Sequence, residues 1–404
     1  MRRVAWMLLL LFAFAIPWQY SLEIGEPVGN IARIVGLMLL LVAVPAILQS
    51  GRMRTPGALP WLVLALYLWF CCSFFWSIEP QATLARMRGY FQEMMTVWLV
   101  WELAESPEDL RALLRTYVAG SWLLALLTVA NFASPEAAGQ IRFAAAGQDP
   151  NDVARFLALG FPMAALLLEA ESSWAGRLLA FGYLPLGLAG VLLTASRGGF
   201  VAAVVALAGC GVLLLRRPAR AAVAGFMALP IFAAGFWFVL PHETLGRIAT
   251  IPEQLQGGDL NQRLNIWAAG WQAFVHAPFF GTGAGSFVSA AGLAPADTAH
   301  NTALTIVVEG GIVALMLAAA IVAVCARSVL QTEGPLRIAF GTALLVWLVT
   351  SAVATVEQNR TTWLLLGLIA VAGRLAAEDR DALARCFPGE TERAATASVV
   401  EPIA

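Results

Sequence analysis

The chain has 404 residues, of which 60% are hydrophobic and 13% are charged, and its formal net charge is −1. Soluble domains carry about 25% charged residues, so this composition, with a mean hydropathy of +0.75, excludes an ordinary soluble protein. The near-zero net charge indicates no particular partner, and no nucleic-acid partner is expected.

All 25 basic residues are arginine, which a GC-rich gene would explain. Any anion site must then use arginine, whose planar fork suits phosphate oxygens. The five cysteines show neither a disulfide framework nor a metal-ligand spacing, so we expect no metal site and no cofactor.

Long apolar segments follow one another along most of the chain. Crossing a ~30 Å hydrocarbon layer takes about 20 residues, and backbone hydrogen bonding restricts such spans to helices. We therefore predict an all-α integral membrane protein with about twelve transmembrane helices, at roughly 4–20, 31–49, 60–76, 89–104, 112–132, 153–170, 178–195, 200–215, 221–240, 302–325, 338–356 and 361–376. The first segment lacks a small-residue cleavage site and is predicted to be a retained span rather than a signal peptide.

The placement of arginine predicts the orientation in the membrane. A compact cluster at Arg216, Arg217 and Arg220 favours the cytoplasmic side. Both termini are then cytoplasmic, and the large polar loop at 241–301 lies outside. Residues 1–376 form one polytopic membrane domain, and 377–404 read as a cytoplasmic tail with a short helix followed by disorder.

Two positions on the predicted outer face come before this loop. Residues 149–152 form a good turn and helix start for the sixth span, and Arg155 follows on the same side. Arg197 lies in the tight turn Ser196-Arg197-Gly198-Gly199, where glycine lets the backbone approach a ligand closely. Alternatively, this turn is a simple hairpin with a snorkelling arginine.

The loop at 241–301 contains all three histidines, His242, His276 and His300, and also Arg247 and Arg263. A membrane protein that confines its histidines to one extramembrane loop is expected to do its chemistry there.

Within the loop, an apolar stripe predicts an amphipathic helix at the membrane interface, formed by Leu264, Trp267, Trp271 and Phe274. Asn261 would cap this helix. Arg263 would lie in its first turn, where free backbone amides could help it bind phosphate. The alternative is a lone arginine on a solvated face.

His300 lies where the loop enters the tenth span. A neutral imidazole there could accept a proton from a hydroxyl near pH 7, although an interfacial histidine can also simply cap a helix. Asn301 could cap the same helix or orient the imidazole.

Two further polar positions lie close to the apolar spans. Glu309 follows His300 by nine residues, half a helical turn out of phase, so the two cannot form a dyad on a regular helix. Glu309 would lie inside a predicted membrane span, where a carboxylate suggests a function. Alternatively, Gly310-Gly311 allows close helix packing, and Glu309 forms a hydrogen bond to a neighbouring residue. Glu357 and Arg360 could line the same cavity or simply pair with each other.

Five short segments together resemble the O-antigen ligase and O-antigen polymerase superfamily of bacterial inner-membrane glycosyltransferases. They are 193–199 (LTASRGG), 263–267 (RLNIW), 278–285 (PFFGTGAG), 299–301 (AHN) and 309–311 (EGG). The resemblance covers roughly 150–320 and rests on the order, spacing and membrane side of the segments. The predicted number of spans fits this superfamily over the whole chain.

The resemblance implies a donor glycan on undecaprenyl pyrophosphate and an acceptor hydroxyl, such as that of lipid A-core. Arg197 and Arg263 match the family arginines that hold the pyrophosphate, and His300 matches the proposed general base. Asn301, Glu309, Arg360 and Arg155 would support the site. The implied reaction inverts the anomeric centre without a metal, on the periplasmic face of the inner membrane and in contact with membrane lipids.

Several alternatives stay open. An O-antigen or exopolysaccharide polymerase, or a protein O-oligosaccharyltransferase, would carry similar segments. A transporter or flippase for the same lipid-linked glycan is a different class. It would be expected to carry charges along a central path and broken helices at the midplane, whereas here the charges collect at the predicted outer surface.

Overall fold

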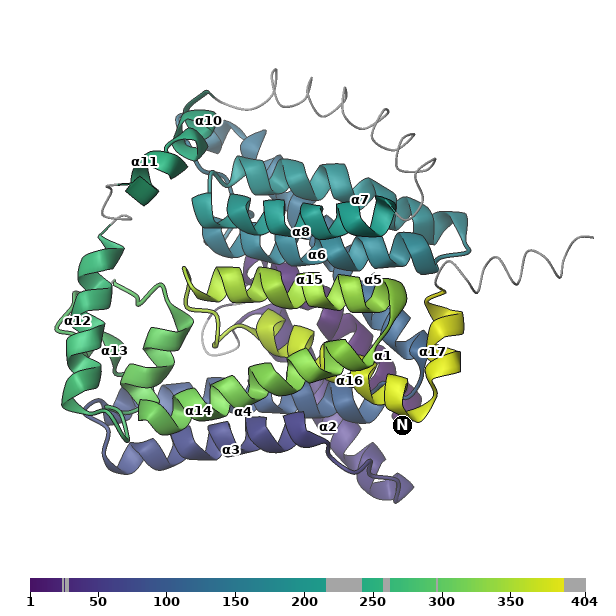
Figure 1. Ribbon diagram of the computed structural model, residues 1–404, viewed down its shortest axis with the longest axis horizontal. Helices are drawn as coiled ribbons and strands as arrows, with labels where there is room; N and C mark the ends of the chain where they lie inside the picture. The colour runs from purple at the N-terminus through teal and green to yellow at the C-terminus, as the bar shows by residue number, and fades with distance from the viewer. Residues whose placement is uncertain (24, 26–28, 216–241, 257–261, 296, 389–404) are drawn as a thin grey trace, which may run out of the picture.

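The structure is a computed structural model that describes the chain except for residues 24, 26–28, 216–241, 257–261, 296 and 389–404 (Figure 1). The longer helices are α1 (Arg2–Ala15), α2 (Ile31–Ser50), α3 (Ala58–Cys72), α4 (Pro80–Leu103), α5 (Pro107–Phe132), α6 (Pro150–Ala170), α7 (Trp174–Leu193), α8 (Arg197–Leu215), α12 (Arg263–His276), α14 (Thr302–Gln331), α15 (Gly334–Ser351) and α16 (Arg360–Glu378). The shorter α-helices are α10 (His242–Ala249), α11 (Ile251–Gln256), α13 (Phe287–Ala290) and α17 (Arg380–Cys386).

The all-α membrane fold is confirmed. Ten helical segments among the described residues are long and apolar enough to cross a membrane. Of the other two predicted spans, 89–104 corresponds to the second half of α4, a helix whose charged residues, such as Arg86 and Glu93, lower its hydropathy. The span predicted at 221–240 lies outside the described residues, so the count of twelve stays a prediction.

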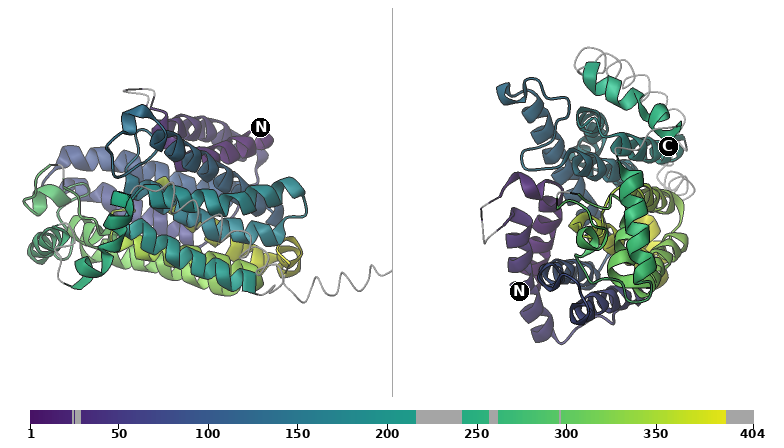
Figure 2. Two further views of the ribbon diagram at one scale, coloured as in Figure 1. Left: turned by 90° about the horizontal axis from the view of Figure 1, so that it is seen from above. Right: turned by 90° about the vertical axis from the view of Figure 1, so that its left-hand side faces the viewer.

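The long helices run side by side, and the two ends of the bundle differ (Figure 1). One end carries α10 to α13 and is called here the loop end. The other carries the N-terminus and α17 and is called the terminal end. The α12 helix lies across the loop end at a steep angle to the long helices (Figures 1 and 2). This is the arrangement expected of a helix in the plane of a membrane interface.

Two helices form the centre of the bundle. In the apolar stretches of α6 and α16, 94% and 83% of the residues are buried inside the protein, compared with 33% in α2 and α8. A helix that is apolar on all sides and surrounded by other helices has no lipid-facing side. The central position of α6 matters for the site, because its first turns carry Asn151 and Arg155.

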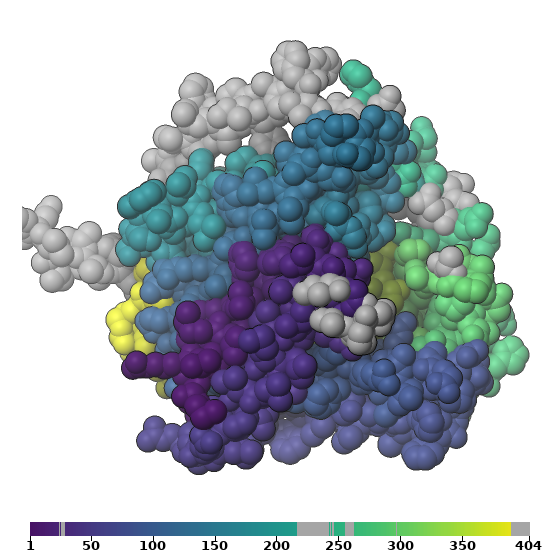
Figure 3. Space-filling model, turned by 180° about the vertical axis from the view of Figure 1, so that it is seen from behind, coloured from purple at the N-terminus to yellow at the C-terminus, as the bar shows by residue number. Residues whose placement is uncertain are grey.

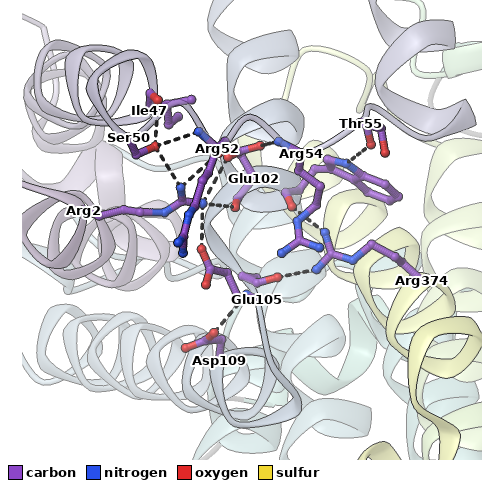
Figure 4. A network of polar contacts seen from close by, with 12 residues as sticks. Arg2, Ile47, Ser50, Arg52, Arg54, Thr55, Glu102, Glu105, Asp109 and Arg374 are labelled. Atoms are coloured by element: carbon purple, nitrogen blue, oxygen red, sulfur yellow. Dashed lines mark hydrogen bonds and ion pairs between the residues drawn. The ribbon is translucent and has the colours of Figure 1, made fainter.

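At the terminal end, a polar network ties the helices together (Figure 4). The Glu102 carboxylate is fully buried and accepts hydrogen bonds from the Arg2 guanidinium at 3.1 Å and the Arg54 backbone N–H at 2.8 Å. Arg2 also pairs with Glu105 at 2.6 Å, and Arg374 donates to the carbonyl of Trp101 at 2.7 Å. These contacts join α1, α4 and α16 and give the buried charge a partner.

At the loop end, α14 is interrupted at Gly311, which has φ of 67° and ψ of −168°. The glycine-rich loop after α12 packs against this break. The Thr282 and Gly283 amides donate to the carbonyls of Val308 and Glu309, both at 2.9 Å. A Cβ on Gly311 would lie 2.1 Å from the carbonyl oxygen of Phe279, so only glycine fits here. The Gly310-Gly311 pair therefore does allow close packing, through a broken helix rather than a regular one.

Candidate functional site at the loop end

The turn between α7 and α8 is built around Ser196. Its Oγ accepts a hydrogen bond from the Gly199 amide at 3.1 Å and donates to the Asn151 Oδ1 at 2.9 Å. A Cβ on Gly199 would lie 2.2 Å from the Cβ of Ala154, so this glycine lets α8 begin in direct contact with α6. The turn is thereby fixed to the part of α6 that carries Arg155.

A small cavity of about 30 Å³ joins elements that are distant in the sequence. It is lined by Asn151, Arg155, Ser196, Gly198, Gly199, Arg263, Thr350, Val353 and Ala354. The first turns of α6, α8 and α12 and the chain after α15 therefore meet at one point. Arg155 is 3% exposed and pairs with Asp152 at 2.7 Å. The structure thus brings together Arg155, Arg263 and the turn that contains Arg197.

The arginines around this cavity lie close enough to repel one another. Burial lowers the pKa of Arg263, and the charge of Arg197 lowers it further. The pKa of Arg142 is lowered first by burial and then by Arg247, with smaller contributions from Arg197 and Arg263, while Asp149 opposes the shift. Like charges held together in a half-buried place favour the binding of an anion between them.

His300 lies within the electrostatic range of this cluster. Burial lowers the pKa of its imidazole, and the positive charge of Arg263 lowers it further, against the opposing effects of Asp149 and Asp297. The imidazole is therefore neutral at pH 7 and can accept a proton. Its Nε2 lies 3.1 Å from the Thr298 Oγ1. The backbone of His300 has a φ of 47°, which is uncommon for a residue with a side chain.

Asn301 caps α14. Its Oδ1 accepts from the Leu304 amide at 2.9 Å, and its Nδ2 donates to the Ala352 carbonyl at 3.3 Å. Of the two predicted roles, the structure shows the cap. The chain before it is held by α12, because the Trp267 Nε1 donates to the Ala299 carbonyl at 2.9 Å.

The predicted helix at 264–274 is present as α12, with Arg263 as its first residue. Its stripe divides into two faces: Trp267 and Phe274 pack against α13 and α14, while Leu264 and Trp271 are 48% and 55% exposed. The predicted cap, Asn261, lies outside the described residues.

Glu309 does not join His300. Its carboxylate is 1% exposed and accepts from the Phe287 amide at 3.4 Å, at the start of α13. This contact matches the packing alternative, in which Glu309 bonds to a neighbour.

Arg360 also lies apart from the small cavity. Its guanidinium donates to the side-chain oxygens of Gln19 and, at 2.6 Å, Gln92. No ion pair joins it to Glu357 within the described residues, so that predicted pairing is not seen.

Sequence reasoning gave no role to Arg142, which the structure places in the cluster. Its guanidinium donates to the Asn151 Oδ1 at 2.8 Å and to the Thr194 carbonyl at 3.2 Å. It lies in the connection between α5 and α6, and only its predicted outer location could have drawn attention to it. By contrast, His242 and His276 are both exposed, and no role follows from their positions.

Together these features define a multi-pass, all-α membrane protein with a cluster of arginines and a neutral histidine at one end of its bundle. Residues 182–319 match the family model described as O-antigen ligase. The match covers about a third of the chain and shows that this stretch is similar to an O-antigen ligase domain, in agreement with the resemblance seen in the sequence. It includes Arg197, Arg263, His300 and the broken part of α14. No curated protein matches the chain.

Proposed function

We propose that the protein is a glycosyltransferase that moves a glycan from undecaprenyl pyrophosphate to an acceptor hydroxyl, such as that of lipid A-core. The site would face the periplasm from the bacterial inner membrane, with both termini in the cytoplasm. The observation that carries this proposal is the juxtaposition of Arg197 and Arg263 with a neutral His300. It supplies a place for a pyrophosphate beside a base.

The proposed reaction is a single displacement. The acceptor oxygen forms a bond to the anomeric carbon while the bond from that carbon to the pyrophosphate oxygen breaks. The acceptor proton passes to the His300 imidazole, and undecaprenyl pyrophosphate leaves with the bonding electrons. Arginines preorganised around the leaving group stabilise its growing charge, and we propose that no metal ion is needed for this. Attack opposite the leaving group inverts the anomeric centre.

Transfer to lipid A-core would make the protein a ligase. Transfer to a growing glycan would make it a polymerase, and transfer to a protein hydroxyl an oligosaccharyltransferase. These reactions share the donor site and differ in the acceptor. A flippase for the same lipid-linked glycan would move the donor without breaking its bond.

The test is glycan transfer in liposomes that contain the purified protein, a lipid-linked glycan and an acceptor. His300→Ala is expected to lower turnover about 10²- to 10⁴-fold, the usual contribution of a general base. His276→Ala is the matched control and should leave turnover unchanged, because His276 is exposed and its imidazole bonds the Gln272 carbonyl of its own helix. Full activity in His300→Ala would exclude the base role.

The pyrophosphate role is tested separately by donor binding. Arg197→Ala and Arg263→Ala should weaken binding of the lipid-linked donor, whereas the exposed Arg88→Ala should not. A chelator should leave transfer by the wild-type protein unchanged. Donor bound equally well by both cluster variants would refute the assignment, and donor movement across the bilayer without transfer would favour the flippase.

A further inference from the structure

A second feature lies between α1, α2 and α4, apart from the small cavity at the loop end. It is a groove of about 250 Å³, lined by Phe12, Ala32, Arg33, Gly36, Leu37, Leu39, Leu40, Phe91, Gln92, Met95, Thr96, Leu99 and Arg360. It shares no lining residue with the small cavity. Most of its wall is apolar, and its two charged residues are both arginines.

The groove reaches the surface of the bundle. Leu37 on α2 is 57% exposed and Phe91 on α4 is 37% exposed. Figure 3 shows α1 and α2, coloured purple, forming part of the outer face of the molecule beside the segments of α3 to α5. Because α1 and α2 are candidate membrane spans, this face meets hydrocarbon chains.

Arg33 and Arg360 bring positive charge to this apolar groove. Arg33 lies in the first turn of α2, which Asn30 caps by accepting from the Arg33 amide at 3.0 Å. Arg360 is held in place by Gln19 and Gln92. The two guanidinium groups repel one another, and the buried Glu93 partly balances Arg360. Among the described residues, the Arg33 guanidinium has no carboxylate within ion-pair distance.

An apolar groove that faces hydrocarbon and carries two mutually repelling arginines is complementary to one kind of occupant. An acyl chain would cover Leu37, Leu40 and Phe91. A headgroup phosphate would accept hydrogen bonds from Arg33 and lie between the two repelling guanidinium groups. A zwitterionic headgroup would bring a positive group to the same place and lose this advantage.

We propose that the groove binds an anionic phospholipid of the surrounding bilayer, with its phosphate at Arg33 and Arg360 and one acyl chain along α2 and α4. This site does not depend on the proposed transferase function, because it shares no lining residue with the cavity of Arg155 and Arg263.

The test uses the full chain in neutral detergent, with bound lipid counted by native mass spectrometry. Phosphatidylglycerol should be retained in preference to phosphatidylcholine with the same acyl chains. Arg33→Gln should weaken that preference about fivefold, the effect of one arginine near a lipid phosphate. Arg88→Gln removes the same charge from an exposed position on α4 outside the groove and should leave the preference for phosphatidylglycerol unchanged. Leu40→Trp should reduce retention of both lipids by filling the groove.

Equal retention of the two lipids by the wild-type protein would overturn the proposal, even if a variant failed to fold. So would an equal loss in Arg33→Gln and Arg88→Gln. Binding of glycerol phosphate as tight as that of phosphatidylglycerol would indicate a site for free phosphate instead. Preferred retention of undecaprenyl phosphate would indicate a site for prenyl chains.

Discussion

Arginines lie close to one another at both ends of the bundle. At the terminal end, Arg2 contacts both Glu102 and Glu105. At the loop end, burial and the charge of Arg197 lower the pKa of Arg263. An anionic substrate would remove this repulsion, and we therefore expect its binding to stabilise the fold by mass action.

The pKa of the His300 imidazole measures the electrostatic effect of the nearby arginines. Because burial and Arg263 both lower its pKa, its imidazole should titrate below 6.5. Arg263→Gln removes one of these causes and should move the titration midpoint upward. The three histidines can be followed by NMR in labelled protein, with the exposed His276 as an internal control. An unchanged titration midpoint of His300 in Arg263→Gln would mean that the two side chains do not interact electrostatically.

Glu357 is a buried carboxyl group in the connection between α15 and α16. Burial, and then the charge of Glu309, raises its pKa to about 7 from 4.5. Between pH 4.5 and 7 the folded protein holds a proton that the unfolded chain releases, so the free energy of unfolding falls as pH rises through this window. Glu357→Gln stays neutral and should flatten that dependence, raising stability at pH 8 by a few kcal/mol at most.

The measurement for Glu357 is the thermal unfolding temperature in detergent from pH 5 to 8. The exposed Glu136→Gln is the matched control and should follow the wild-type curve. A Glu357→Gln curve parallel to the wild type would contradict the raised pKa.

At the scale of elements, the break in α14 connects the fold to the site. Gly311→Ala would force a Cβ to within 2.1 Å of the Phe279 carbonyl oxygen. We expect it to destabilise the protein by at least 1–3 kcal/mol through backbone strain, and to lower glycan transfer by displacing the glycine-rich loop. Gly341→Ala in α15 is the control: its Cβ would lie 3.6 Å from a Val329 methyl group, an ordinary contact. That variant should be neutral or slightly stabilising, and equal unfolding temperatures for the two variants would rule out the strain.

The sequence predicted a helix well where a single local pattern, such as helical periodicity, determined it. The spacing of Leu264, Trp267 and Trp271 predicted α12, because helical periodicity is a local property. The interruption at Gly311 could not be predicted in the same way. It depends on the Thr282 and Gly283 amides, which arrive from a separate loop to bond the carbonyls before the break.

At the scale of the molecule, the polar network at the terminal end should be a main source of stability. Glu102→Ala leaves Arg2 and the Arg54 amide without their buried acceptor, and should cost about 2–3 kcal/mol. Glu105→Ala removes a carboxylate that contacts the same arginine but is 51% exposed. It should cost less than about 1 kcal/mol. Chemical unfolding of the two variants provides the comparison, and equal losses would show that burial of Glu102 contributes nothing.

The sequence predicted the membrane fold and much of the candidate site because hydropathy and the spacing of short segments are visible along the chain. It predicted that Arg155, Arg197, Arg263 and His300 would share one face. It could not separate Arg360 from that set, since only packing shows that Arg360 turns toward Gln19 and Gln92. Arg142 had no distinguishing neighbours in the sequence and was recognised only when the helices were assembled.

The hydrogen bond from Trp267 to the Ala299 carbonyl joins the helix that begins with Arg263 to the residue before His300. Bilayers of different thickness shift interfacial helices along the membrane normal. Since α12 and the strained backbone at His300 are connected by this bond, such a shift would carry both side chains together. Their mutual position would then be insensitive to lipid composition, even where the depth of the whole site is not.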